Sequence, residues 1–154
     1  MTHLKQGDKA PDFTLPTDGN GTFSLSAHRG KKIVLYFYPK DDTSGCTKQA
    51  CGFRDLHTQL NKLDALVVGV SKDSVKSHDK FKAKYELNFP LVSDEDSKLM
   101  TEYGVWVEKS LYGRKYMGAE RTTFIIDEEG VIAAIFPKVK IDGHMAEVTA
   151  ALAA

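Results

Sequence analysis

Residues 32–38, with the sequence KIVLYFY, constrain the fold more than any other segment of the chain. After Lys32 the run is apolar at every position, without alternation, and it ends at Pro39. Because successive side chains of a strand point to opposite faces of a sheet, such a run predicts a central strand that is buried on both faces. Residues 65–70 (ALVVGV) have the same character and predict a second buried strand.

A third buried strand is predicted near the carboxyl end of the chain. Residues 122–126 (TTFII) are followed by a short segment with a glycine, 127–130, and then by a further apolar run, residues 131–136. This pattern is typical of two antiparallel strands joined by a hairpin loop. A more polar pattern of the same kind in residues 13–25, with turn residues at 18–21, predicts an added hairpin near the amino terminus.

Helical patterns separate the predicted strands. Some carry start or stop signals, such as Asp73-Ser74 before the second helix and Gly104 after the third. The four expected helices cover residues 46–63, 74–85, 97–103 and 142–152. Strands that alternate with helices and close with an antiparallel hairpin predict an α/β fold of the thioredoxin-like type, with a mixed central sheet and helices on both faces.

Composition indicates one catalytic domain. With 154 residues, 42% of them hydrophobic, and no linker or repeat, the chain is expected to form a single domain over residues 1–154. Twenty-one basic residues balance 21 acidic ones, so attraction to nucleic acid or to an anionic membrane surface is not expected. No apolar stretch has the length of a signal peptide or a membrane span, which favours a cytoplasmic location.

The two cysteines of the chain, Cys46 and Cys51, lie where a chemical role is expected. In a reducing cytoplasm an idle cysteine pair would stay as thiols, so a structural disulfide is not expected. Cys46 begins a predicted helix directly after the first buried strand, and ligands bind at this junction in open α/β sheets. The helix N-terminus favours the thiolate, which is the reactive form. A helical wheel places Cys51 opposite the apolar stripe, so it is not there as a small core residue.

The helix that carries both cysteines sets a condition on any disulfide between them. In an ideal α-helix the Cα atoms of Cys46 and Cys51 are about 8.7 Å apart, beyond the roughly 4.4 to 6.8 Å that a disulfide accepts. The helix must therefore unwind, over roughly residues 43–56, before the bond can form. Gly52 favours unwinding, because glycine costs a helix about 1 kcal/mol relative to alanine.

A short motif before Cys46 carries a resemblance to a known family. Pro39, Thr43 and Cys46 match the pattern of Pro, three residues, Thr, two residues, Cys, and on this motif the chain resembles the peroxiredoxins. The chain is also similar to the bacterioferritin-comigratory or Q-type subgroup, with a resemblance that runs over about residues 7–152. The features that carry the subgroup resemblance are Cys51 and the segments 93–95 (SDE), 103–106 (YGVW) and 121–127 (RTTFIID).

The resemblance implies a thioredoxin fold and peroxide reduction driven by thioredoxin or a similar dithiol protein. It implies that Cys46 is the peroxidatic nucleophile and Cys51 the resolving cysteine. It further implies that Thr43 and Arg121 bind and polarise the peroxide, and that Pro39 shields the thiolate. A fixed hydroxyl and a guanidinium suit this role, because the attack moves negative charge onto the leaving oxygen. An intramolecular resolving cysteine removes the chemical need for a dimer, so a monomer is expected.

Three residues of this region have alternative interpretations. Thr43 precedes a helix and could serve as its N-cap, as a peroxide ligand or as both. On composition alone, Arg121 could equally be a surface ion-pair partner. Ser44 stands where the family usually has proline, and without the fixed φ of proline the loop before Cys46 is expected to be more mobile.

Two other functions are compatible with a cysteine pair. A thiol-disulfide oxidoreductase of the same fold would normally carry Cys-x-x-Cys, which this chain lacks. A thiol-based metal-binding protein would need a histidine near the cysteines, but the five histidines are scattered along the sequence. The Cys-x4-Cys spacing is also unlike that of zinc sites, so no metal or cofactor is expected. The acidic residues 94–96 read as an exposed turn.

Overall fold

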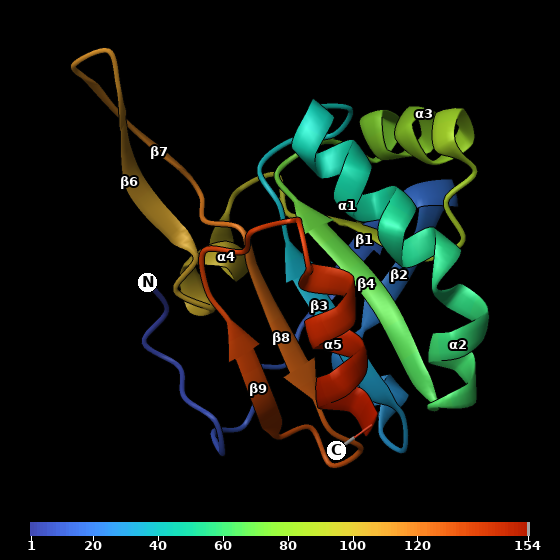
Figure 1. Cartoon of the computed structure of the whole chain (residues 1–154). Coiled ribbons are helices and arrows are strands. Elements are labelled where there is room, and N and C mark those ends of the chain that lie inside the picture. Colours follow the sequence, from blue (N-terminus) through green and yellow to red (C-terminus); the bar gives the residue numbers. More distant parts are fainter. Residues whose placement is uncertain (154) are drawn as a thin grey trace.

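A computed structural model describes residues 1–153 of the chain (Figure 1). The strands are β1 (Thr14–Thr17), β2 (Gly21–Ser24), β3 (Lys32–Phe37), β4 (Ala65–Ser71), β5 (Leu91–Ser93), β6 (Trp106–Leu111), β7 (Arg114–Ala119), β8 (Thr122–Ile126) and β9 (Ile132–Phe136). The α-helices are α1 (Ser44–Asp55), α2 (His57–Lys62), α3 (Val75–Tyr85), α4 (Lys98–Glu102) and α5 (His144–Ala153). Within residues 1–153, every helix is too short or too polar to cross a membrane.

Seven strands form one mixed sheet, in the order β2-β1-β5-β4-β3-β8-β9. The central strand β3 pairs in parallel with β4 and antiparallel with β8. β8 and β9 form the antiparallel hairpin that the sequence predicts, and β1 and β2 form the predicted hairpin near the amino terminus. The parallel pairs β3–β4 and β4–β5 end at the same edge of the sheet, where the loops after them lie together.

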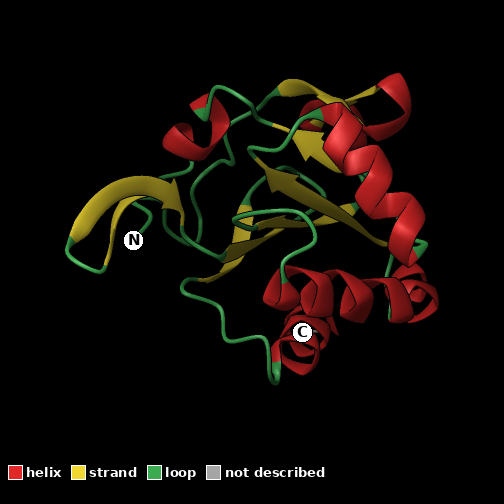
Figure 2. Cartoon of the chain, turned by 90° about the horizontal axis from the view of Figure 1, so that it is seen from above, coloured by secondary structure: helices red, strands yellow, loops and turns green. Residues whose placement is uncertain are grey.

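Both faces of β3 are buried, as its unbroken apolar run predicts. Val34 and Tyr36 pack on the face covered by α1, α2, α3 and α5, whereas Ile33, Leu35 and Phe37 pack on the opposite face with α4. Figure 2 shows helices on the two sides of the sheet. This arrangement agrees with the expected α/β fold of mixed sheet and two helical layers.

The helix expected over residues 46–63 is wrong at both ends and in the middle. It begins two residues earlier, at Ser44, and it breaks at Leu56, where the backbone takes φ −85° and ψ −1°. The short helix α2 then runs in a different direction from α1 (Figure 1). Leu60 still reaches the core from α2, so the apolar stripe continues across the break and its periodicity hides the change of direction.

Two features were not predicted from the sequence. The first is β5, a strand of three residues, which is too short for a periodic signal. The second is the β6–β7 hairpin, a separate two-stranded sheet that projects from the body of the molecule (Figure 1). The expected exposed turn at residues 94–96 is wrong for Asp94, which is 1% exposed. Its carboxylate accepts hydrogen bonds from the backbone N–H groups of Leu99 and Met100 in α4.

Candidate active site

Cys46 lies at the edge of the sheet, in the first turn of the helix that follows β3. Thr43 is the N-cap of α1, so Cys46 is the third helical residue, and it is 1% exposed. The first helical hydrogen bond runs from Thr47 N–H to the Thr43 carbonyl. The N–H groups of the residues between them therefore lack helical acceptors and make this end of α1 attractive to anions. Reactive cysteines of proteins are often found at such helix N-termini.

Arg121 contacts the thiol from the neighbouring strand. Since β8 pairs antiparallel with β3, with Thr122 opposite Phe37, the residue just before β8 lies beside the carboxyl end of β3. Arg121 Nη2 donates to Cys46 Sγ at 3.1 Å. The structure thus brings together two of the residues that the sequence singles out, 75 positions apart, and excludes a surface ion pair as the main contact of Arg121.

Gln49 holds the other side of the guanidinium, and it was missed from the sequence. Its Oε1 accepts a hydrogen bond of 2.6 Å from Arg121 Nη1, and its side chain is fully buried. Gln49 lies three residues after Cys46, on the same face of α1, so helical spacing could have identified it. Its Nε2 is buried and has no hydrogen-bond partner within residues 1–153.

Replacing Gln49 with leucine is expected to lower the second-order rate constant for peroxide reduction about 10-fold. The change leaves Arg121 Nη1 without its acceptor, and a hydrogen bond to a charged group contributes about 1.5–3 kcal/mol, of which about 1.4 kcal/mol corresponds to a factor of ten in rate. Gln49→Glu is the matched control, because a carboxylate still accepts from the guanidinium. Stopped-flow kinetics would contradict this role of Gln49 if Gln49→Leu matched the wild type.

Thr43 and Pro39 lie in the loop before α1 and make no hydrogen bond to the thiol. Thr43 is exposed, and its Oγ1 donates to the Lys40 carbonyl at 3.0 Å. Its backbone is at the N-cap position, but its side chain forms no capping hydrogen bond, so the interpretation as a side-chain N-cap is wrong. Pro39 follows β3 directly after Tyr38 and is also exposed.

Cys51 lies on the same helix as Cys46 but not on its buried face. The buried residues of α1 are Cys46, Gln49, Ala50 and Phe53. Cys51 is half-buried, and both cysteines are free thiols. Because α1 is continuous from Ser44 to Asp55, the ideal separation of about 8.7 Å between the two Cα atoms applies, and no disulfide can form while α1 is intact.

The chain after β9 covers the segment of α1 between the two cysteines. A Cβ atom at Gly45 would lie 3.1 Å from Ile141 Cδ1, and one at Gly52 would lie 3.0 Å from Met145 Sδ. Because Gly45 and Gly52 lack a Cβ atom, the chain after β9 can pack closely against α1 just before Cys46 and just after Cys51. Unwinding of α1 must break these contacts.

Ser44 occupies the first helical position of α1, where proline is readily accepted. Thr43 has φ −88° and ψ 155°, which is the conformation that a residue before proline adopts. Ser44→Pro is therefore expected to raise the free energy of unfolding by about 0.4–1 kcal/mol, because it restricts the unfolded chain without native strain. Denaturant titration measures this effect. Unchanged stability together with unchanged peroxide kinetics would contradict the expected mobility of this loop.

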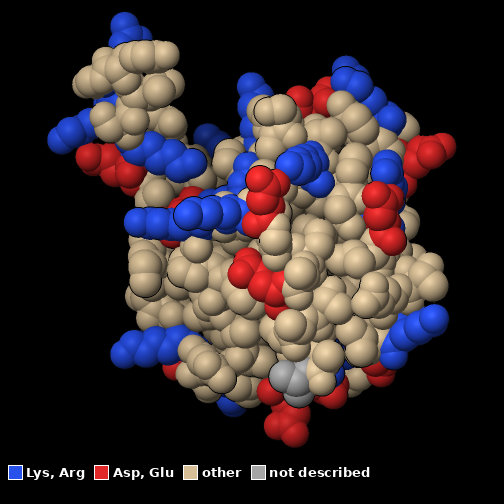
Figure 3. Space-filling model, viewed as in Figure 1, with Lys and Arg blue, Asp and Glu red and all other residues tan. Residues whose placement is uncertain are grey.

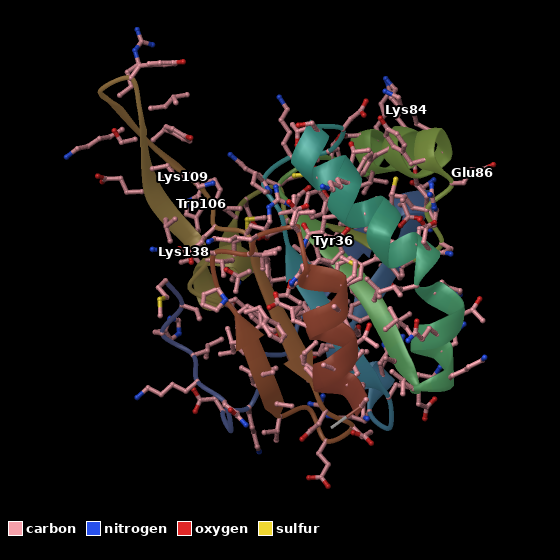
Figure 4. The ribbon with its side chains drawn as sticks, in the orientation of Figure 1. Tyr36, Lys84, Glu86, Trp106, Lys109 and Lys138 are labelled. Atoms are coloured by element: carbon pink, nitrogen blue, oxygen red, sulfur yellow. The ribbon has the colours of Figure 1, made fainter. Side chains whose placement is uncertain are left out.

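Aromatic side chains form the floor of the site under α1. Tyr36 is fully buried and packs against Tyr38 and Phe53, with ring centroids 5.3 Å and 4.8 Å apart (Figure 4). Burial, and then the negative charge of a Cys46 thiolate, raises the pKa of Tyr36 well above 10.0, so its phenol stays protonated. These rings exclude water from the inner side of the thiol, which strengthens its interaction with Arg121.

Lys109 brings a second cation toward the site from β6. Figure 4 shows its side chain reaching from β6 toward the body of the molecule. Burial, followed by the positive charge of Arg121, lowers the pKa of Lys109 below its ordinary value of 10.5. On the face of the molecule shown in Figure 3, basic and acidic side chains are interspersed.

The residues that the structure describes offer no cluster of three or more His, Cys, Asp and Glu side chains that could hold a metal ion. The metal-binding alternative therefore has no ligand set to build on among residues 1–153. The chemistry available at this site is that of a thiol held beside a guanidinium at a helix N-terminus.

Sequence and fold are both similar to those of known proteins. The family model described as AhpC/TSA matches residues 6–135. A putative peroxiredoxin bcp of Coxiella burnetii is 60% identical over 149 residues, which cover 97% of this chain and 99% of the relative. A solved structure of a Xylella fastidiosa PrxQ mutant has a TM-score of 0.94 at 39% identity, with 99% of this chain and 98% of that chain covered. The Xanthomonas campestris bacterioferritin comigratory protein, studied for its alkyl peroxide reduction activity, has a TM-score of 0.90 at 42% identity, with coverages of 99% and 98%. These matches confirm the expected thioredoxin-like peroxiredoxin fold and the resemblance to the bacterioferritin-comigratory and Q-type subgroup.

Proposed function

Because this chain belongs to the AhpC/TSA family and is a thiol-dependent peroxidase, we propose that Cys46 is the thiolate that attacks the peroxide and that Cys51 resolves the product. The observation that carries the proposal is the hydrogen bond of 3.1 Å from Arg121 Nη2 to Cys46 Sγ at the N-terminus of α1. A guanidinium and a helix N-terminus both favour the anionic sulfur that peroxide attack requires.

In the first step the Cys46 thiolate attacks one oxygen of the peroxide, and the O–O bond breaks. The leaving oxygen departs as hydroxide or alkoxide and becomes water or an alcohol on protonation, while Cys46 becomes a sulfenic acid. Arg121 stabilises the charge that develops on the leaving oxygen. For Thr43 to donate to the peroxide as well, its hydroxyl must turn away from the Lys40 carbonyl. Pro39 restricts solvent access from the loop side.

In the second step the Cys51 thiol attacks the sulfenic sulfur of Cys46, so that an S–S bond forms and water leaves. This step requires α1 to unwind, because the intact helix keeps the two sulfurs on different turns. Resolution by Cys51 prevents further oxidation of Cys46 to the sulfinic acid. A dithiol protein then reduces the disulfide by thiol-disulfide exchange, and we infer that thioredoxin or a similar protein fills this role.

We propose that the substrates are hydrogen peroxide and small organic hydroperoxides. We further propose that the protein acts in the cytoplasm as a monomer. Alkyl peroxide reduction by the Xanthomonas campestris relative supports the organic substrates. The competing function, a general thiol-disulfide oxidoreductase, is less well supported, because its two thiols would need to exchange without unwinding of α1.

A coupled assay tests the proposed cycle. Reduced wild-type protein is mixed with peroxide in the presence of NADPH, thioredoxin reductase and thioredoxin, and NADPH oxidation is followed. We expect sustained turnover with hydrogen peroxide and with cumene hydroperoxide, and first-order dependence on thioredoxin at low concentration. Turnover with glutathione and glutaredoxin but not with thioredoxin would exclude thioredoxin as reductant. Rapid reduction of insulin disulfides without peroxide consumption would favour the oxidoreductase alternative.

A further inference from the structure

A buried ion pair lies beneath the loop that precedes α1. His78 in α3 is fully buried, and Asp41 in the loop is 7% exposed. His78 Nδ1 and Asp41 Oδ2 are 2.7 Å apart. Neither residue is hydrogen-bonded to Cys46 or Arg121, and no sequence pattern singles out either of them. A buried charged pair is costly unless it is fully hydrogen-bonded, so its presence requires an explanation.

Both ring nitrogens of His78 face hydrogen-bond acceptors. Nδ1 faces the Asp41 carboxylate, and Nε2 lies 2.9 Å from the carbonyl oxygen of Val92 in β5. A neutral imidazole carries only one N–H, so it would leave one nitrogen lone pair against an acceptor oxygen. Only the imidazolium, which has an N–H group at each nitrogen, can donate to both acceptors.

The charges around His78 agree with this assignment. Burial alone would lower the pKa of His78, but the hydrogen bond and the charge of Asp41, the Val92 carbonyl and the charge of Asp73 outweigh burial and raise the pKa above 6.5. Asp41 comes from the loop before α1, Asp73 from the loop after β4, and Val92 from β5. The hydrogen-bond geometry and the raised pKa both favour the imidazolium, which loses its proton as the pH rises through that raised pKa.

Asp41 connects this pair to the loop of the peroxide site. Its carboxylate also accepts from Tyr38 Oη and from Ser77 Oγ, at 2.5 Å and 2.9 Å. Its backbone N–H donates to Asp73 Oδ2 at 2.8 Å. Hydrogen bonds with Tyr38, with α3 and with Asp73 thus hold the loop at Asp41, which lies two residues before Thr43.

We propose that the Asp41–His78 pair is a positioning pair for peroxide reduction, which holds residues 39–43 in the conformation that the attack on peroxide requires, and which does so only while His78 is charged. The proposal rests on the proposed function of Cys46. The pair touches neither peroxide nor thiol, and it acts through the placement of Pro39 and Thr43. When His78 loses its proton, the Asp41 carboxylate loses its charged donor in a buried environment, and only neutral donors such as Tyr38 Oη and Ser77 Oγ then hold it.

The sign of the pH effect follows from the raised pKa of His78. The folded protein binds this proton more tightly than the unfolded chain, so the stabilisation from the pair is complete below about pH 6.5 and is lost as the pH rises through the raised pKa. The rate of peroxide attack should decline as the pH rises through the same raised pKa.

The experiment measures the second-order rate constant for oxidation of Cys46 between about pH 6 and pH 10 by stopped flow, in the wild type and in His78→Gln. The wild-type rate is expected to fall about 10-fold at alkaline pH, the size expected when a positioning group is displaced by less than an ångström. His78→Gln should be slower at neutral pH by a similar factor and should lack the alkaline fall. Nitrogen-15 NMR of the wild type should give an imidazolium signal for His78 at neutral pH, which titrates with the kinetic midpoint.

Two control variants separate this proposal from others. His57→Gln, at a histidine of α2 that is bonded to Asn61, should keep the wild-type profile. Lys109→Met tests a cation near the site whose pKa is lowered. An alkaline fall that disappears in Lys109→Met and persists in His78→Gln would overturn the proposal, as would a neutral His78 imidazole in the NMR spectrum.

The NMR test needs no variant, so the proposal can still be tested if the His78→Gln protein fails to fold. Equal rates in wild type and His78→Gln would reject the positioning role alone, whereas a wild type inert to peroxide would reject the proposed function and this inference with it.

Discussion

Replacing Cys46 with serine is expected to abolish peroxide reduction at every peroxide concentration. A serine hydroxyl does not ionise near neutral pH and is a poor nucleophile toward an O–O bond, so neither Arg121 nor the N-terminus of α1 can compensate for the lost sulfur. The side chains are similar in size, so the buried position should tolerate the change. Peroxide consumption by the purified variant, with circular dichroism to verify folding, measures this effect.

Cys51→Ser is the matched control for Cys46→Ser. It should reduce one equivalent of peroxide at the wild-type rate and then stop, because the sulfenic acid at Cys46 has no internal thiol to condense with. Excess peroxide should drive this variant to the sulfinic acid. Equal multiple-turnover activity of both variants would contradict the roles assigned to the two cysteines.

Replacing Arg121 with glutamine is expected to lower the rate constant for peroxide reduction about 100- to 1,000-fold. The guanidinium lies 3.1 Å from the sulfur and is held by Gln49, so it is already in place where charge develops during the attack. Removal of one such prearranged donor typically costs a factor of about 10² to 10³ in rate. Glutamine keeps one donor nitrogen but lacks the charge and the second donor nitrogen, which in Arg121 is the Nη1 that donates to Gln49 Oε1.

Two further variants make the Arg121 experiment specific. Arg121→Lys keeps the charge without the planar fork and should retain an intermediate rate. Arg114→Gln removes an exposed arginine from the β6–β7 hairpin and should leave the rate unchanged. If Arg121→Gln and Arg114→Gln lost activity to the same small extent, Arg121 would contribute only general charge and not transition-state stabilisation.

The sequence predicted the parts of the fold that depend on long apolar runs and on local spacing. The three buried strands that became β3, β4 and β8 were predicted because each is enclosed by neighbours on both faces. The first turn of a helix was correctly predicted at Cys46, but the helix begins at Ser44, so Cys46 is its third residue and not its first. The contact between Arg121 and Cys46 was expected only through a family resemblance, since the antiparallel register of β3 and β8 is not encoded in local pattern.

The features that were not predicted from the sequence depend on contacts between residues that lie far apart in the chain. The hydrogen bond of Gln49 to Arg121 and the pairing of Asp41 with His78 join residues that are 72 and 37 positions apart. The spacing of Gln49 from Cys46 indicates a shared helix face but does not identify Arg121 as its partner, and no local pattern marks His78. The break at Leu56 left the apolar stripe intact, so its periodicity gave no sign of two helices.

Addition of one equivalent of hydrogen peroxide to the reduced wild-type protein tests whether Cys46 and Cys51 form a disulfide during peroxide reduction. Intact mass spectrometry and a thiol titration on the same sample report the product. We expect loss of both thiols and a mass about 2 Da below that of the reduced protein, with the Cys46–Cys51 disulfide found in the peptide map. Retention of both thiols, with the peroxide unconsumed, would contradict it.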